Sequence, residues 1–202
     1  MEITRRQALR TTGLLSGAVL LGSTALGTQT PANASESGWR WCQKCEGLWF
    51  SNGSGRGICM AGPGVGHSTE NSGYYTMLAI GEEIGASQPG WSRCQACQGL
   101  YYSGAGRSGS CAATLSGSGG HYQAKSGYSL EYAGQNDAQE HRQPGWRWCD
   151  KCELLWFGAR ATFAGNHLWN GAARDQCPRD VLGHRYYDYN ANYRVPHVGL
   201  AA

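Results

Sequence analysis

The chain has 202 residues, and its 17 Lys and Arg against 14 Asp and Glu give a formal net charge of +3. Arg5, Arg6, Arg10 and Glu2 lie near the N-terminus, so the remainder of the chain is close to neutral. A basic stripe of the kind that binds nucleic acid is therefore absent, and no long apolar stripe with the helical period of 3.6 residues is present.

The N-terminal segment 1–34 differs in kind from the rest. Arg5 and Arg6 precede a glycine-diluted apolar run over residues 13–27, and Ala32-Asn33-Ala34 forms a small-residue cleavage site. This pattern resembles a bacterial twin-arginine export signal, and the alternative is a disordered tail with a chance arginine pair. The apolar run is too short to span a bilayer permanently, and no cysteine stands near the cleavage point to take a lipid. We expect a secreted protein that begins near Ser35 and has no permanent membrane anchor.

All nine cysteines fall into one pattern, Cys-x2-Cys followed by a third Cys and then a His, which occurs three times. Two thiolates separated by two residues can hold one tetrahedral ion from a single tight turn, the knuckle, while the later Cys and His complete the site. The sets are Cys42, Cys45, Cys59 and His67; Cys94, Cys97, Cys111 and His121; and Cys149, Cys152, Cys177 and His184.

Three sulfurs and one imidazole suit zinc best, so we predict three structural zinc ions per chain. Disulfides are the rival interpretation, but three cysteines per unit is an odd number, and each unit would leave a thiol unpaired or force bridges between units. Spacing alone leaves iron or another thiophilic metal open. The export signal favours metal, because the twin-arginine route carries folded, cofactor-loaded proteins, whereas a thiol-rich chain threaded unfolded into an oxidising space would form disulfides.

The repeat extends beyond the ligands and predicts a small all-β fold of three tandem zinc-ribbon-like hairpin modules with little helix. In the first module we expect strands over residues 39–41, 47–50, 57–60 and 74–78. The predicted organisation is a signal peptide at 1–34, modules at 35–79, 90–133 and 145–195, linkers at 80–89 and 134–144, and a tail at 196–202. The linkers end in Gln-Pro-Gly, which is typical of a turn before the next module.

The aromatic side chains are the other notable resource. The repeated Trp39, Trp91 and Trp146, with Leu48, Leu100 and Leu155, are expected to cover their own zinc knuckles as miniature cores. The position before the first ligand holds Trp41, Arg93 and Trp148. We interpret this position as solvent-facing and as a candidate ligand-binding surface, and packing against a neighbouring module is the alternative.

The third module carries an insertion, because Cys152 and Cys177 lie much further apart in the chain than the matching cysteines of the other two modules. The extra segment, within residues 158–176, contains His167 and Trp169 as further candidate ligand-binding residues. The alternative is a tolerated surface insertion, since loops accept extra length at low cost.

The string W-x-x-C-x-x-C-x-G-L, followed by a glycine-rich stretch, Cys and His, resembles a tandem repeat of secreted actinobacterial and myxobacterial proteins. Leu154 replaces the glycine of that string in the third module. The resemblance implies an exported accessory or binding module without a defined ligand.

Four protein ligands leave no open metal position for a nucleophilic water, and no catalytic residues can be assigned. We therefore expect a non-catalytic protein that binds an extracellular polysaccharide or an envelope component. The alternatives are a secreted enzyme or enzyme accessory with its site in the insertion at 158–176, and a zinc-ribbon nucleic-acid binder, which the charge and the export signal oppose.

Overall fold

The computed structural model describes residues 34–51, 55–62, 64–114, 119–134, 141–158, 162–164, 167–169, 177–179, 183–185 and 192–198. All of them belong to one unit of the chain, Pro31–Ala202. The predicted signal peptide at 1–34 lies outside the described residues, apart from Ala34.

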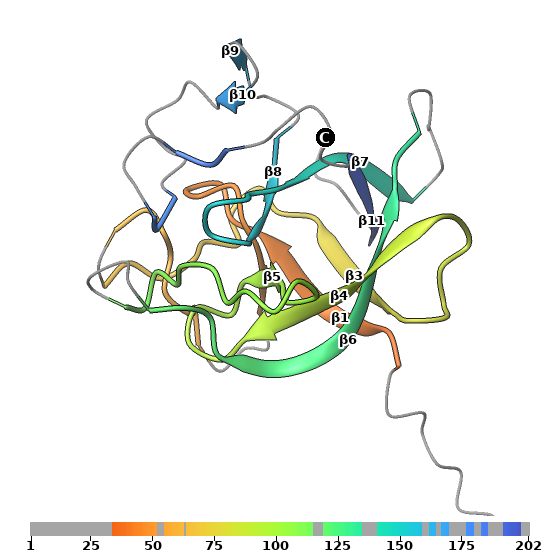
Figure 1. The fold of residues 1–202 in the computed structure, drawn as a ribbon, viewed down its shortest axis with the longest axis horizontal. Coiled ribbons are helices and arrows are strands. Elements are labelled where there is room, and N and C mark those ends of the chain that lie inside the picture. The colour runs from red at the N-terminus through yellow and green to blue at the C-terminus, as the bar shows by residue number, and fades with distance from the viewer. Residues whose placement is uncertain are drawn as a thin grey trace, which may run out of the picture. The chain divides into compact units, whose positions relative to one another are not determined.

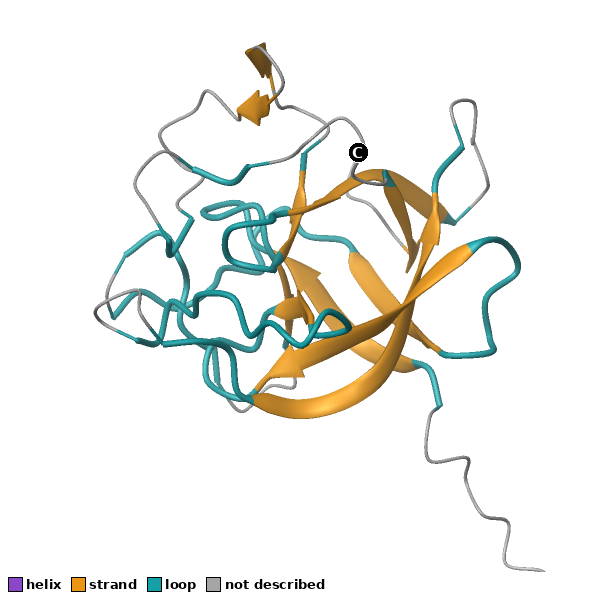
Figure 2. Ribbon diagram, viewed as in Figure 1, coloured by secondary structure: helices purple, strands orange, loops and turns teal. Residues whose placement is uncertain are grey.

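The described residues form strands, turns and loops without any helix, so the all-β prediction is confirmed (Figure 2). Residues 57–60 are loop and turn, and the strand predicted there is wrong. The strands are β1 Glu36–Trp41, β2 Leu48–Phe50 and β3 Tyr74–Ala79 in module 1; β4 Ser87–Cys94, β5 Leu100–Tyr102 and β6 Gln123–Tyr132 in module 2; and β7 Arg142–Trp148, β8 Leu155–Phe157, β9 Thr162–Ala164, β10 His167–Trp169 and β11 Tyr193–Val198 in module 3.

Each module begins with a hairpin whose turn is the knuckle. In module 1 the Cys42 N–H donates to the Gly47 carbonyl at 3.0 Å, and the Glu46 N–H donates to the Cys42 carbonyl at 2.7 Å. Glu46 has a φ of +57°, in the left-handed region that side chains other than glycine seldom adopt. Gln98 and Glu153 repeat this conformation at φ values of +61° and +66°. The same backbone therefore presents the first two cysteines of all three modules.

The first and last long strands of each module pair antiparallel, as β1 with β3, β4 with β6 and β7 with β11. The last strands also pair with one another in a cycle, which joins the modules into one nearly closed sheet (Figure 1). Tyr128 lies opposite Ala79, Tyr193 opposite Tyr132, and Tyr75 opposite His197. Each of these three tyrosines therefore pairs with a residue of another module. That residue lies four positions after the corresponding tyrosine of its own module.

The short strands repeat the cycle at the end of the sheet where the knuckles lie. Isolated bridges join Trp49 to Gly99, Tyr101 to Leu154 and Trp156 to Gly47. The following N–H groups donate in the same cyclic order to knuckle carbonyls: Phe50 to Gln98, Tyr102 to Glu153 and Phe157 to Glu46, at 2.8 to 2.9 Å. The three modules are therefore related by an approximate threefold repeat of their contacts.

One core lies inside this sheet, and every module contributes the same four positions to it. Trp39 meets Tyr128 edge to face at a centroid distance of 5.6 Å, and the equivalent rings of the other modules meet at 5.4 and 5.5 Å. The buried members are Trp39, Trp91, Trp146, Leu48, Leu100, Leu155, Tyr75, Tyr128, Tyr193, Met77, Leu130 and Val195.

The expectation of three miniature cores is corrected by this arrangement. The repeated tryptophans and leucines belong to the shared core, whereas a second cluster holds the nine cysteines with Trp49, Tyr101 and Trp156. A short hairpin cannot bury an indole by itself, so the three hairpins bury their tryptophans together.

The segments predicted as linkers contain parts of strands. Ser87–Cys94 begins inside the first of them and Arg142–Trp148 inside the second. Residues 196–198 of the predicted tail belong to β11, which pairs with β3, β6 and β7. The first strands of modules 2 and 3 therefore belong to the shared sheet.

Candidate metal centres

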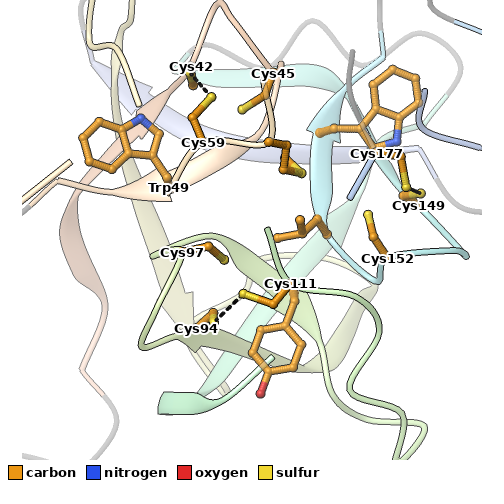
Figure 3. Close-up of a cluster of buried hydrophobic side chains, with 14 residues drawn as sticks. Cys42, Cys45, Trp49, Cys59, Cys94, Cys97, Cys111, Cys149, Cys152 and Cys177 are labelled. Atoms are coloured by element: carbon orange, nitrogen blue, oxygen red, sulfur yellow. Dashed lines mark hydrogen bonds between the residues drawn. The ribbon is translucent and has the colours of Figure 1, made fainter. Parts of the chain in front are cut away.

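The structure gathers the predicted ligands into three buried Cys3His clusters. Figure 3 shows the nine cysteines of these clusters, three from each module. In each cluster two cysteines come from the knuckle, and the third cysteine and the histidine come from the loops that follow the hairpin. The four ligand atoms of a cluster all lie within 4.8 Å of one another. Loops gather at the knuckle end of the sheet, so all three sites lie at that end (Figure 2).

The distances within the clusters match a zinc tetrahedron. Ligand bonds of about 2.3 Å to sulfur and about 2.0 Å to nitrogen imply sulfur–sulfur edges of about 3.8 Å and sulfur–nitrogen edges of about 3.5 Å. The observed Sγ–Sγ distances are 3.8, 3.7 and 3.9 Å in modules 1, 2 and 3. The distances from the second knuckle sulfur to His Nδ1 are 3.6, 3.6 and 3.5 Å. The donor sets therefore fit three structural zinc ions per chain.

Disulfide bonds do not fit this geometry, because all nine cysteines are free and a bonded sulfur pair would lie at about 2.0 Å. Burial, together with the neighbouring sulfurs of the cluster, raises the pKa of Cys45 and of Cys152 well above its ordinary value. Three thiolates in such a place need a cation. A bound divalent ion supplies that charge and removes the thiol protons.

Each ligand histidine is fixed by stacking and, in two modules, by a hydrogen bond on its outer nitrogen. Trp49 stacks on His67, Tyr101 on His121 and Trp156 on His184, with centroid distances of 4.9, 4.6 and 5.3 Å. With Nδ1 turned to the sulfurs, His67 Nε2 lies 3.0 Å from the Cys97 carbonyl and His121 Nε2 lies 2.9 Å from the Cys152 carbonyl. His184 Nε2 is buried and has no such partner in the described part of the chain.

Two glycines allow the ligand loops to approach the next knuckle. A Cβ at Gly57 would lie 2.5 Å from the Cys97 carbonyl oxygen, and one at Gly109 would collide with the Cys152 carbonyl. Both residues also have left-handed φ values, +56° and +59°. Glycine at these positions therefore permits the contact between a loop of one module and the knuckle of the next.

Backbone N–H groups approach the cluster sulfurs. The N–H of Ser68 lies 3.4 Å from the Cys42 sulfur, that of Ala61 lies 3.4 Å from the Cys59 sulfur, and that of Arg185 lies 3.4 Å from the Cys149 sulfur. Such donors stabilise thiolate charge around a metal. The loops therefore supply outer-shell support as well as ligands.

The three candidate ligand-binding residues before the first cysteines are half-buried between modules. Trp41 meets Phe157 at 6.3 Å, the Arg93 guanidinium lies 4.2 Å from the Phe50 ring centroid, and Trp148 meets Tyr102 at 5.5 Å. The indole N–H groups of Trp41 and Trp148 donate to Glu46 and Glu153, both at 2.8 Å. This placement favours the alternative of packing against a neighbouring module.

The other two candidates, His167 and Trp169, lie on β10, which pairs with β9 in a separate two-stranded sheet. His167 pairs with Ala164 and Trp169 with Thr162. Their side chains, and most of the insertion at 158–176, lie outside the described residues. The prediction of a ligand-binding role there stays a prediction.

A cavity of about 550 Å³ beside the first metal site was missed by the sequence reasoning. It is lined by Trp49, Ser51, Gly55, Arg56, His67, Ser68, Thr69 and Glu70. Gln43 Nε2 donates to a Glu70 carboxylate oxygen at 2.6 Å. Module 2 carries Ser108, Tyr122 and Ala124 where module 1 has Arg56, Ser68 and Glu70. This departure from the repeat is the feature of the sequence that could have indicated a special site in module 1.

The fold and the sites define an all-β protein in which three structural Cys3His metal centres support one shared core. Comparison with protein-family models, curated proteins and solved structures found no match to this chain. No helix among the described residues is long and apolar enough to cross a membrane.

Proposed function

We propose that this is an exported, non-catalytic binding protein that holds an extracellular polysaccharide or a glycan of the cell envelope. The fully enclosed metal sites support this proposal, because four protein donors leave no position for substrate or for an activated water. The metal ions then maintain the shape of the knuckle end, and recognition falls to side chains around them.

The cavity in module 1 carries the proposal. Arg56 supplies donors, the Glu70 carboxylate supplies acceptors, and the hydroxyls of Ser68 and Thr69 supply both. Neighbouring sugar hydroxyls also donate and accept, so a sugar unit is the ligand class that matches this mixed lining. The volume of the cavity lies within the range of roughly 300–1,000 Å³ that is typical of small-ligand sites.

Exposed tyrosines offer further contact area for a longer glycan. Tyr74 is 57% exposed and Tyr122 is 64% exposed. The Arg40 guanidinium lies 3.4 Å from the centroid of the Tyr74 ring and holds the ring in place. Flat, partly ordered rings of this kind can stack on sugar faces at a low entropic cost.

Export is the second part of the proposal, and the N-terminal pattern supports it. A protein with three metal-loaded thiol clusters benefits from folding before it meets an oxidising space, because free thiols there would form disulfides. Arg5, Arg6 and the Ala32-Asn33-Ala34 cleavage site supply the corresponding signal.

The test uses the zinc-loaded chain from residue 35 and insoluble glycans, including cellulose, chitin and peptidoglycan. The double variant Arg56→Ala/Glu70→Ala keeps the net charge constant, so its effect cannot come from nonspecific electrostatics. Each lost charged hydrogen bond costs about 1.5–3 kcal/mol, and the expected loss of affinity is at least tenfold. Ser108→Ala, at the position in module 2 that corresponds to Arg56, is the matched control and should bind normally. Absence of binding to every glycan, or equal binding by the double variant, would overturn the proposal.

A further inference from the structure

The ligand histidines connect the metal sites in one direction along the chain. The outer nitrogen of His67 bonds to the carbonyl of Cys97, which is itself a ligand of the second site. His121 bonds in the same way to the carbonyl of Cys152, a ligand of the third site. The first site thus depends on the second knuckle, and the second site depends on the third knuckle.

The third histidine breaks this series although the surrounding contacts complete the cycle. Trp156 bridges to Gly47, and the Phe157 N–H donates to the Glu46 carbonyl at 2.8 Å, as at the other two junctions. His184 is 1% exposed, yet its Nε2 has no hydrogen-bond partner within the described residues. A buried ring N–H without an acceptor pays its desolvation without compensation.

Outer-shell partners of metal-binding histidines orient the ring and raise its basicity, and their loss typically weakens metal binding roughly 10–100-fold. We propose that the three metal sites are unequal and linked, and that they release zinc in the order third, second, first. Within the described part of the chain, the histidine of the third site has no hydrogen-bond partner on its outer nitrogen. When it empties, the Cys152 carbonyl loses its fixed position and His121 loses its acceptor. Emptying of the second site then loosens Cys97 beneath His67 in the same way.

The length of the loop between the knuckle and the third cysteine also favours weaker zinc binding at the third site. The segment between Cys152 and Cys177 is longer than the segment between the matching cysteines of either other site, so more chain must be ordered to close the third site. The shared core is a separate cluster from the cysteines, so one site can open while the sheet remains folded. This inference concerns the metal centres alone and does not depend on the proposed glycan binding.

The order of release can be measured on the full zinc-loaded chain without any substitution. Limiting EDTA is added in steps, each step is followed by a short pulse of N-ethylmaleimide, and peptide mass spectrometry locates the labelled cysteines. When one zinc per chain has been lost, the label should be on Cys149, Cys152 and Cys177. The next ion should expose the module 2 cysteines. Equal labelling of all nine cysteines, or first labelling in module 1 or 2, would overturn the proposal.

Two variants test the direction of the link. Cys177→Ser disables the third site and should weaken zinc binding at the second site about 10–100-fold, as read from the labelling of Cys94. Cys59→Ser disables the first site. Within the described residues, no ligand histidine bonds to the knuckle of that site, so zinc binding at the second and third sites should be unchanged. Equal weakening of the second site by both variants would contradict a one-way link. Should either variant fail to fold, the release order of the unsubstituted chain still decides.

Discussion

Replacement of one core tryptophan should destabilise all three modules at once. Trp91 is fully buried in module 2, where it meets Tyr102 of its own module at 5.4 Å and Tyr193 of module 3 at 5.5 Å. Loss of a buried tryptophan to alanine typically costs about 3–5 kcal/mol, a large part of the roughly 5–15 kcal/mol that separates folded from unfolded domains. In a chain of this size, Trp91→Ala should lower the Tm by about 6–20 °C.

Thermal unfolding of the zinc-loaded protein, followed by tryptophan fluorescence and by thiol labelling, measures this effect. One transition should shift to lower temperature, and cysteines of modules 1 and 3 should become reactive together with those of module 2. Tyr122→Ala, at an exposed position, is the control and should change stability by less than about 0.5 kcal/mol. Two transitions, with modules 1 and 3 still protected when module 2 is labelled, would refute the shared core.

Three further predictions concern a buried ion cluster, export and metal removal. Glu131 is fully buried and accepts from Arg142 at 3.0 Å and Arg194 at 2.9 Å, so Glu131→Ala should cost about 3–5 kcal/mol in denaturant unfolding, and an unchanged midpoint would contradict its role. Replacement of Arg5 and Arg6 by lysine should retain the precursor inside the cell in a fractionation assay, whereas normal secretion would exclude the twin-arginine route. Removal of all three ions with excess EDTA should abolish the near-UV circular dichroism, since zinc binding contributes roughly 10–16 kcal/mol per structural site, and a persistent tertiary signal would count against metal stabilisation.

The metal ligands could be predicted from the sequence because the knuckle is a local structure. Two cysteines three positions apart must share one turn, and the odd number of cysteines per repeat argued against disulfides. The hairpins β1–β2, β4–β5 and β7–β8 follow from the same local reasoning. Pairing between modules could not be read in this way, because a repeated tryptophan has the same spacing whether it packs within its own module or against another.

The register of the strands around the shared core was the feature hardest to predict from the sequence. Sequence alignment equates Tyr74 with Tyr128, since each follows Ser-Gly at the same distance from the ligand histidine. In the structure the buried tyrosine of module 1 is Tyr75, while Tyr74 is largely exposed. A shift of one residue reverses which face of a strand is buried, and only the partner strands decide it. The cavity beside the first metal site depends likewise on loops that meet in space.

Three enclosed metal ions, and no disulfide bonds, hold the knuckle end of this fold. The decisive measurement is elemental analysis of the purified, zinc-loaded chain, combined with mass spectrometry of the intact protein under denaturing and under native conditions. We expect three zinc ions per chain and nine reduced cysteines once the metal is removed. Protein that is folded with bridged sulfurs and without a bound transition metal would contradict it.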